Sequence, residues 1–140
     1  MASAIYNSFK AHVMNGNVNL SSDTVFVMLV TDYTVDIDAH EERNDVTGSE
    51  VTGTGYTAAG AEITTLPVSI DDTDNEGVWD GTDVTWASST IDAEGAIIYK
   101  SSGASTTDYL IAYIDFGGAK SSSNGNFTIQ WSSEGIINLT

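Results

Sequence analysis

Short apolar runs separated by turn residues are the feature that most constrains how this chain can fold. Clusters of Gly, Asn, Asp and Ser follow most of the runs, and this punctuation is typical of strands joined by tight turns. The runs that we interpret as strands are 24–30, 50–56, 61–70, 83–89, 95–101, 108–118, 126–131 and 135–139. Many short strands of this kind predict an all-β fold, either an antiparallel β-sandwich or a jelly roll.

Three of these segments carry more specific expectations. The continuous run "TVFVMLV" (24–30) predicts a strand that is buried on both faces. In "NFTIQW" (126–131), Phe127, Ile129 and Trp131 alternate with polar residues, so these three side chains should point inward. Pro67 cannot donate to a sheet ladder, which predicts an edge strand or a bulge there. Turn chemistry is also expected at "DG" (80–81), "EG" (94–95 and 134–135), "GG" (117–118) and "NGN" (124–126).

Before the strands, residues 1–16 predict a short amphipathic helix. Ile5, Phe9 and Val13 are four residues apart and form one apolar stripe, with Tyr6 beside it. Ser3 is the expected N-cap and Gly16 the expected stop. A helix this short needs a packing partner, which is either its own sheet or a neighbouring subunit. The sequence therefore predicts one domain, 1–140, with a helix over 1–16 and a β-sandwich over 17–140.

Charge narrows the classes of partner. Twenty acidic residues against four basic ones give a net charge of −16. Such a surface repels phosphate backbones, so we expect no nucleic-acid partner, whereas basic protein surfaces and divalent cations are attracted. The longest strongly apolar run, 25–30, is too short to cross a bilayer, so we expect no membrane partner.

Catalytic chemistry has few candidate residues. The chain has no cysteine, and no serine lies in a GxSxG elbow. His12 falls on the predicted helix, where a surface or interface role is expected. His40 lies in the acidic stretch 36–45, which fits either a hydrated loop or a weak metal or partner site. We therefore expect a protein that is not an enzyme.

The acidic stretch 71–83 resembles a calcium-binding loop in residue type. Asp72, Asp74, Glu76 and Asp83 fall at ligand positions 1, 3, 5 and 12, with Gly77 at the turn. The flanking segments are strand-like, which excludes a helix-flanked calcium hand. Two interpretations remain: a calcium site on a β-loop with these four carboxylates as ligands, or an exposed acidic turn held by Val78 and Trp79. No other cofactor is expected.

Several long phrases together resemble a family of small virion structural proteins of tailed bacteriophages. They run nearly end to end in the same order: "YNSFKAHVMNGNVNLSSDTVFVMLVTDYT", "DAHEERNDVTGSEVTGTGYTAAGAEI", "VTWASSTIDAEGAIIYKS", "LIAYIDFGG" and "FTIQWSSEGIINL". The resemblance implies a component of the virion, made in the host cytoplasm, and it carries over no catalytic motif. It leaves the location within the virion open.

Resemblance and composition together favour a capsid cement or decoration protein on the outer surface of the head. Its expected partners are the major capsid protein and neighbouring copies of itself, in a homo-oligomer on the virion. The expected docking face is the helix stripe of Ile5, Tyr6, Phe9 and Val13, with a free strand edge near Pro67 as the second candidate. The alternatives are a head-fibre or tail-surface adhesin that binds host glycans through Trp86, Tyr56 or the acidic loops, and a tail-tube or tail-completion component.

Overall fold

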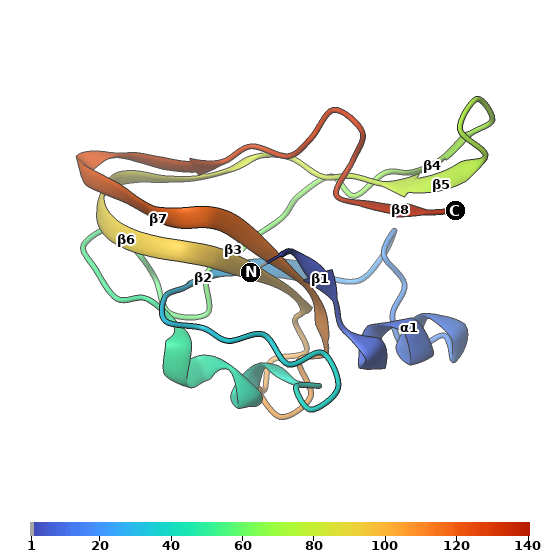
Figure 1. Ribbon diagram of the computed structural model, residues 1–140, viewed down its shortest axis with the longest axis horizontal. Helices are drawn as coiled ribbons and strands as arrows, with labels where there is room; N and C mark the ends of the chain where they lie inside the picture. The colour runs from blue at the N-terminus through green and yellow to red at the C-terminus, as the bar shows by residue number, and fades with distance from the viewer. Residues whose placement is uncertain (1) are drawn as a thin grey trace.

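Two antiparallel sheets form the fold, with one short helix at one end (Figure 1). The computed structural model describes residues 2–140. The five-stranded sheet has the order β1 (Ala4–Ile5), β7 (Leu110–Ile129), β6 (Val84–Lys100), β2 (Val25–Val30) and β3 (Ala61–Glu62). The three-stranded sheet has the order β4 (Val68–Asp71), β5 (Glu76–Trp79) and β8 (Ile137–Leu139). The predicted all-β sandwich with a short N-terminal helix is confirmed.

The β6–β7 hairpin contributes to both layers of the sandwich. Figure 1 shows both strands turning back on themselves at the left, so that their far ends run beside the three-stranded sheet. Gly117 and Gly118 lie in this part of β7 with φ of +74° and +143°, values that side chains with a Cβ rarely adopt. The pairing of the two strands is also interrupted there, between Ser89 and Ile91 and between Ala93 and Gly95. Irregularities of this kind bend a strand.

Four of the predicted strands are wrong in their boundaries, because they form only two long strands in this hairpin. Segments 83–89 and 95–101 belong to one strand, β6, and segments 108–118 and 126–131 largely belong to β7. The turn signals "EG" (94–95), "GG" (117–118) and "NGN" (124–126) therefore mark irregular positions within strands rather than connections between them. The physical reason is that each strand keeps pairing with the other past its glycines.

The core lies around β2, β6 and the first part of β7. In β2, every residue except Phe26 is buried, which confirms a strand covered on both faces. Two 3₁₀ turns, η1 (Arg43–Asp45) and η2 (Thr47–Ser49), lie on the side of this sheet away from the three-stranded sheet (Figure 1). Phe127 and Ile129 are buried as predicted, while Trp131 is half-buried just beyond β7.

The helix is shorter than predicted. Helix α1 spans Asn7–Met14, because Ala4 and Ile5 instead pair with Tyr113 and Ala112 as strand β1. Ser3 is therefore not the N-cap, and its Oγ accepts a hydrogen bond from the backbone N–H of Asp115 (2.9 Å). Gly16 does follow the helix end, with φ of +74° and its N–H bonded to the carbonyl of Val13 (3.2 Å).

Segment 50–56 is not a strand. Its strand-type pairing is limited to two isolated bridges, Glu50 to Val30 and Thr54 to Thr90. Gly53 explains the close approach, since a Cβ there would lie 2.3 Å from the backbone oxygen of Thr90. Segment 61–70 divides into β3 and β4. Pro67 comes directly before β4, an edge strand of the three-stranded sheet, as the edge expectation required.

Candidate functional site

The exposed large hydrophobic side chains gather at one end of the molecule. Within residues 2–140 they are five, and we call them the apolar end: Val13, Met14, Val68, Ile70 and Leu139. Figure 1 shows α1 and strands β4, β5 and β8 together at this end. Met14, Ile70 and Leu139 are 82%, 81% and 74% exposed. Exposed apolar groups collected in one place mark an interaction surface more often than scattered ones do.

The register of the three-stranded sheet explains why its apolar residues are exposed. Val68, Trp79 and Ile137 form one row across the sheet, and Ile70, Gly77 and Leu139 form the next row on the same face. Trp79 is buried and its indole N–H donates to the carbonyl of Leu20 (3.1 Å). The second row lies beyond Trp79, where Ile70 and Leu139 remain exposed. Gly77 leaves a gap between Ile70 and Leu139, where an added Cβ would meet no atom within 4 Å.

A cleft connects this sheet to the helix. Its volume is about 430 Å³, and it lies between the C-terminal end of α1, the following loop and β4. Val13 lines it from the helix, Leu20 from the loop and Val68 from β4. The helix and the three-stranded sheet therefore present one continuous apolar surface with a hollow in it.

Of the four residues expected to form a docking face, the structure leaves one exposed. Tyr6 is fully buried and Phe9 is 6% exposed, both within the chain's own core. Ile5 is half-buried in β1, whereas Val13 belongs to the apolar end. Four residues of the apolar end, Met14, Val68, Ile70 and Leu139, were not among the expected site residues. The alternation of Val68 and Ile70 in "PVSID", after a proline typical of edges, is the signal that could have identified two of them.

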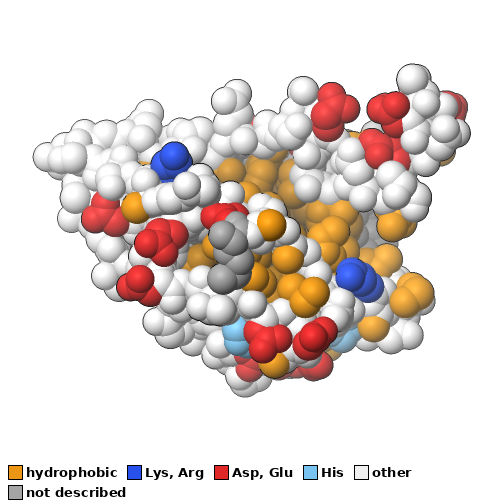
Figure 2. Space-filling model, viewed as in Figure 1, with side chains coloured by type: hydrophobic (Ala, Val, Ile, Leu, Met, Phe, Trp, Pro, Cys, Tyr) orange, Lys and Arg blue, Asp and Glu red, His pale blue; other side chains and the backbone are white. Residues whose placement is uncertain are grey.

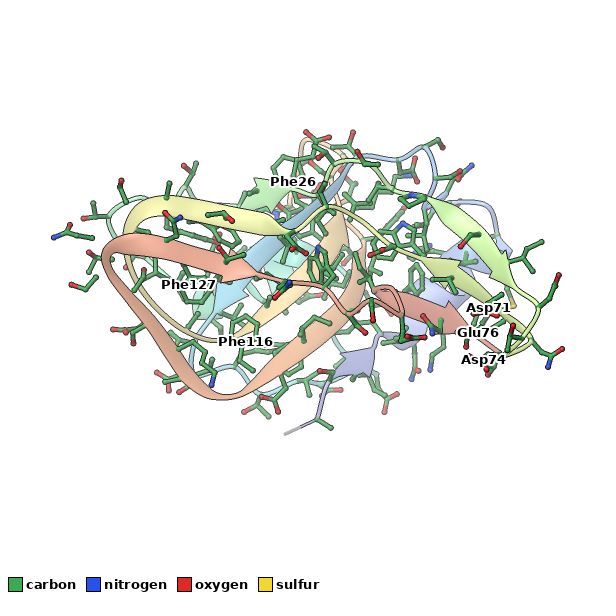
Figure 3. The ribbon with its side chains drawn as sticks, turned by 90° about the horizontal axis from the view of Figure 1, so that it is seen from above. Phe26, Asp71, Asp74, Glu76, Phe116 and Phe127 are labelled. Carbon is green, nitrogen blue, oxygen red and sulfur yellow. The ribbon has the colours of Figure 1, made fainter. Side chains whose placement is uncertain are left out.

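Acidic side chains border the apolar end. The β4–β5 turn carries Asp71, Asp72, Asp74 and Glu76, and ligand atoms of Asp71, Asp74 and Glu76 lie within 4.8 Å of one another (Figure 3). Asp71 Oδ1 accepts hydrogen bonds from the N–H groups of Thr73 (2.8 Å) and Asp74 (3.2 Å). Glu76 Oε1 accepts one from Asn138 Nδ2 (2.6 Å). These bonds fix the turn and leave several carboxylate oxygens free.

The predicted calcium ligands are only partly brought together. Asp74 and Glu76 are neighbours, but the third member of the cluster is Asp71 rather than Asp72. Asp83 lies after β5, where its Oδ1 accepts a hydrogen bond from the backbone N–H of Trp131 (2.9 Å). Three clustered carboxylates are hard oxygen ligands of the kind Ca²⁺ prefers, although Ca²⁺ takes six to eight oxygens. If a calcium titration leaves both the melting temperature and the Trp fluorescence unchanged, the calcium hypothesis fails.

Both histidines pack against tyrosines. The His12 ring stacks on Tyr109 with centroids 3.9 Å apart. His40 Nδ1 bonds to the Tyr33 hydroxyl (2.9 Å), which in turn bonds to the hydroxyl of Tyr6 (2.8 Å). Burial and this bond to Tyr33 raise the pKa of Tyr6, so its phenol stays protonated. These contacts give both rings a structural role: His12 packs helix α1 against Tyr109, and His40 links its loop through Tyr33 to Tyr6.

The aromatic residues proposed for glycan contact are also engaged inside the domain. Trp86 is 6% exposed, and its ring lies 5.8 Å from that of Tyr56. The Tyr56 hydroxyl donates to Glu50 Oε1 (2.8 Å) and accepts from the backbone N–H of Leu29 (3.1 Å). This pair therefore offers no open stacking platform for a sugar ring.

Comparisons with known proteins give no family assignment: no family model, no curated protein and no solved structure matches the chain. Among residues 2–140, no helix combines the length and the apolar character needed to cross a membrane.

Proposed function

We propose that the chain is a structural protein of a tailed-bacteriophage virion, a cement or decoration protein that binds the major capsid protein lattice and stabilises the head. It works by contact with the lattice and with neighbouring copies and catalyses no reaction. The end-to-end resemblance described above supports the virion assignment. The observation that carries the docking role is the concentration of the exposed large hydrophobic side chains at the apolar end.

The apolar end, rather than the predicted helix stripe, is the proposed docking surface. Val13 is shared by both, whereas Tyr6 and Phe9 are committed to the core. Burying one side chain of this size contributes about 1.5–3 kcal/mol, so Met14, Ile70 and Leu139 together can supply the centre of an interface. Repetition over many equivalent lattice positions adds avidity to a modest single contact.

Charge indicates which kind of protein surface fits. The acidic β4–β5 turn borders the apolar end directly, and the whole chain carries −16. A partner surface with an apolar centre and Lys or Arg around it would therefore be complementary, and its association should weaken as salt screens the charges. A capsid lattice would have to carry such basic patches around its binding site.

Co-sedimentation with assembled heads tests the proposal. Gly77→Phe adds a ring beside Ile70 and Leu139 at a position where a Cβ meets no atom within 4 Å. Because the ring changes the shape of the contact surface, we expect at least tenfold weaker binding with an unchanged melting temperature. Gly48→Phe is the matched control, because a Cβ at Gly48 in η2 also meets no atom within 4 Å and lies away from the apolar end. This control should bind like the unmodified protein.

Three outcomes would overturn the proposal. Unmodified protein that fails to sediment with heads excludes cementing, and equal binding by both glycine variants excludes the apolar end as the contact. Assembly of the purified protein into hexameric rings would instead support the tail-tube alternative. In the structure, the long β6–β7 hairpin is folded into the sandwich, with Trp86 and Phe127 buried, which is unlike a hairpin free to build a ring.

A further inference from the structure

A second surface, separate from the apolar end, lies between the two limbs of β7. It is a groove of about 580 Å³. Its lining comes from the first limb (Ile114, Phe116, Lys120 and Ser121), from residues 126–130 of the second limb and from four residues that follow it, Trp131, Ser132, Gly135 and Ile136. Figure 2 shows hydrophobic side chains in a hollow between the two layers. Phe116 and Phe127 come from opposite limbs, and their ring centroids are 6.2 Å apart (Figure 3). We call this hollow the β7 groove.

The second limb borders the groove with an unpaired strand edge. Residues 126–129 pair with β6, as in the registers Val84–Ile129 and Trp86–Phe127. Apart from this pairing with β6, no backbone hydrogen bond among the described residues joins 126–130 to another segment. On the first limb, β1 covers only the positions of Ala112 and Tyr113. A free edge next to an apolar groove is the arrangement that accepts an added strand.

Lys120 gives the groove its charge preference. The other three basic side chains have partners: Arg43 pairs with Asp108 (2.8 Å), Lys100 with Asp23 (3.0 Å), and Lys10 donates to Asn7 Oδ1 (3.0 Å). The side chain of Lys120 is exposed and lines the groove, and its ammonium group has no hydrogen-bond or ion-pair partner among residues 2–140. Among the residues that the structure describes, no Asp or Glu lines the groove. Although the chain carries a net charge of −16, the β7 groove therefore offers a cation to the carboxylate of a partner.

The polar groups favour a peptide over a sugar as the occupant. The indole N–H of Trp131 already donates to the carbonyl of Thr82 (2.9 Å), and Phe127 is 7% exposed against Phe116. Neither offers the open, hydrogen-bonding platform that a saccharide uses. The unpaired strand edge, in contrast, provides backbone donors and acceptors in a row.

We propose that the β7 groove binds an extended segment of another protein, which adds as a strand beside residues 126–130 and places a carboxylate against Lys120. A second copy of this chain is not the proposed source, because the strands of the described residues already belong to the chain's own two sheets. Apolar side chains at alternate positions of the segment would enter the groove. This inference does not depend on the virion assignment.

The test uses a soluble probe peptide of alternating Val and Thr with one Asp, capped at both ends. Titrated into the ¹⁵N-labelled full chain, it should shift the amide signals of 126–130 and of Lys120 and slow hydrogen exchange along the edge. Replacing the Asp by Lys should weaken binding about threefold or more, the size expected for an exposed ion pair. Lys120→Glu should reverse that preference, whereas Lys10→Glu should leave it unchanged.

Backbone methylation separates strand addition from general apolar binding. A peptide with N-methyl groups on the edge-facing residues keeps its side chains but loses the ladder, so we expect at least tenfold weaker binding. Equal binding by the methylated peptide overturns strand addition, and shifts confined to the apolar end overturn the site. Stronger shifts at the same amides with methyl glucuronide than with the peptide would replace the proposal by an acidic-sugar site.

Discussion

The two sheets treat the same kinds of residue in opposite ways. In the five-stranded sheet, Ile97, Ile98 and Leu29 are fully buried, because strands and loops cover both faces. In the three-stranded sheet, Ile70 and Leu139 share a face with Trp79. The Trp79 end of that face packs against the core, whereas Ile70 and Leu139 stay exposed. The difference shows where the chain completes its own packing and where it leaves apolar surface for another protein.

Alkaline pH should have the largest effect, and it should act through the five-stranded sheet. Burial raises the pKa of Tyr6, Tyr56 and Tyr99, which all pack on that sheet. The unfolded state releases these phenolic protons near pH 10 while the folded state holds them, so stability is full below pH 10 and falls as pH rises. We expect unfolding and the appearance of tyrosinate absorbance to coincide. Tyrosinate formation at these sites before unfolding would contradict the assignment.

The next effect compares one isoleucine from each sheet. Ile98→Ala removes a fully buried side chain opposite Val27 and should lower the free energy of unfolding by about 2–5 kcal/mol. Ile70→Ala changes a side chain that is 81% exposed and should alter it by less than about 0.5 kcal/mol. Urea denaturation of both variants measures the contrast. Similar losses would mean that the three-stranded sheet is covered in solution.

A pair of glycines tests backbone crowding in the same way. Gly60 has φ of +85°, and a Cβ there would lie 2.0 Å from the backbone oxygen of Val27 in β2, so Gly60→Ala should cost about 1–3 kcal/mol. Gly77→Ala in β5 meets open space and should be neutral or slightly stabilising, because alanine restricts the unfolded chain. Thermal melts of the two variants provide the measurement, and a melting temperature of Gly60→Ala equal to that of the unmodified chain would rule out the crowding.

Much of the strand content was predictable, because strand preference depends on the pattern of apolar and polar residues over a few neighbouring positions. The run 24–30 and the inward positions of Phe127 and Ile129 needed no tertiary information. Strand ends were less predictable. The glycines at 117–118 resemble a turn in sequence, but β6 and β7 remain paired on both sides of them, so they bend a strand instead.

The candidate site was predictable only in part for a related reason. Periodicity identifies apolar stripes, but it does not say which of them another part of the chain covers. Tyr6 and Phe9 looked available on a helix stripe, yet the core takes both, whereas Ile70 and Leu139 become neighbours only through their registers with Gly77. The carboxylate cluster shows the same limit, since Asp71 rather than Asp72 joins Asp74 and Glu76.

By itself, the sequence determined the all-β class, the short helix after the N-terminus and the strongly acidic surface, because alternation, turn residues and charge are local properties of the chain. Tertiary structure alone decided which apolar side chains stay exposed, which strand edges stay open and which charges find partners. Those outcomes depend on contacts between residues far apart in the chain, such as the pairing of β5 with β8 and the return of β7 beside β6.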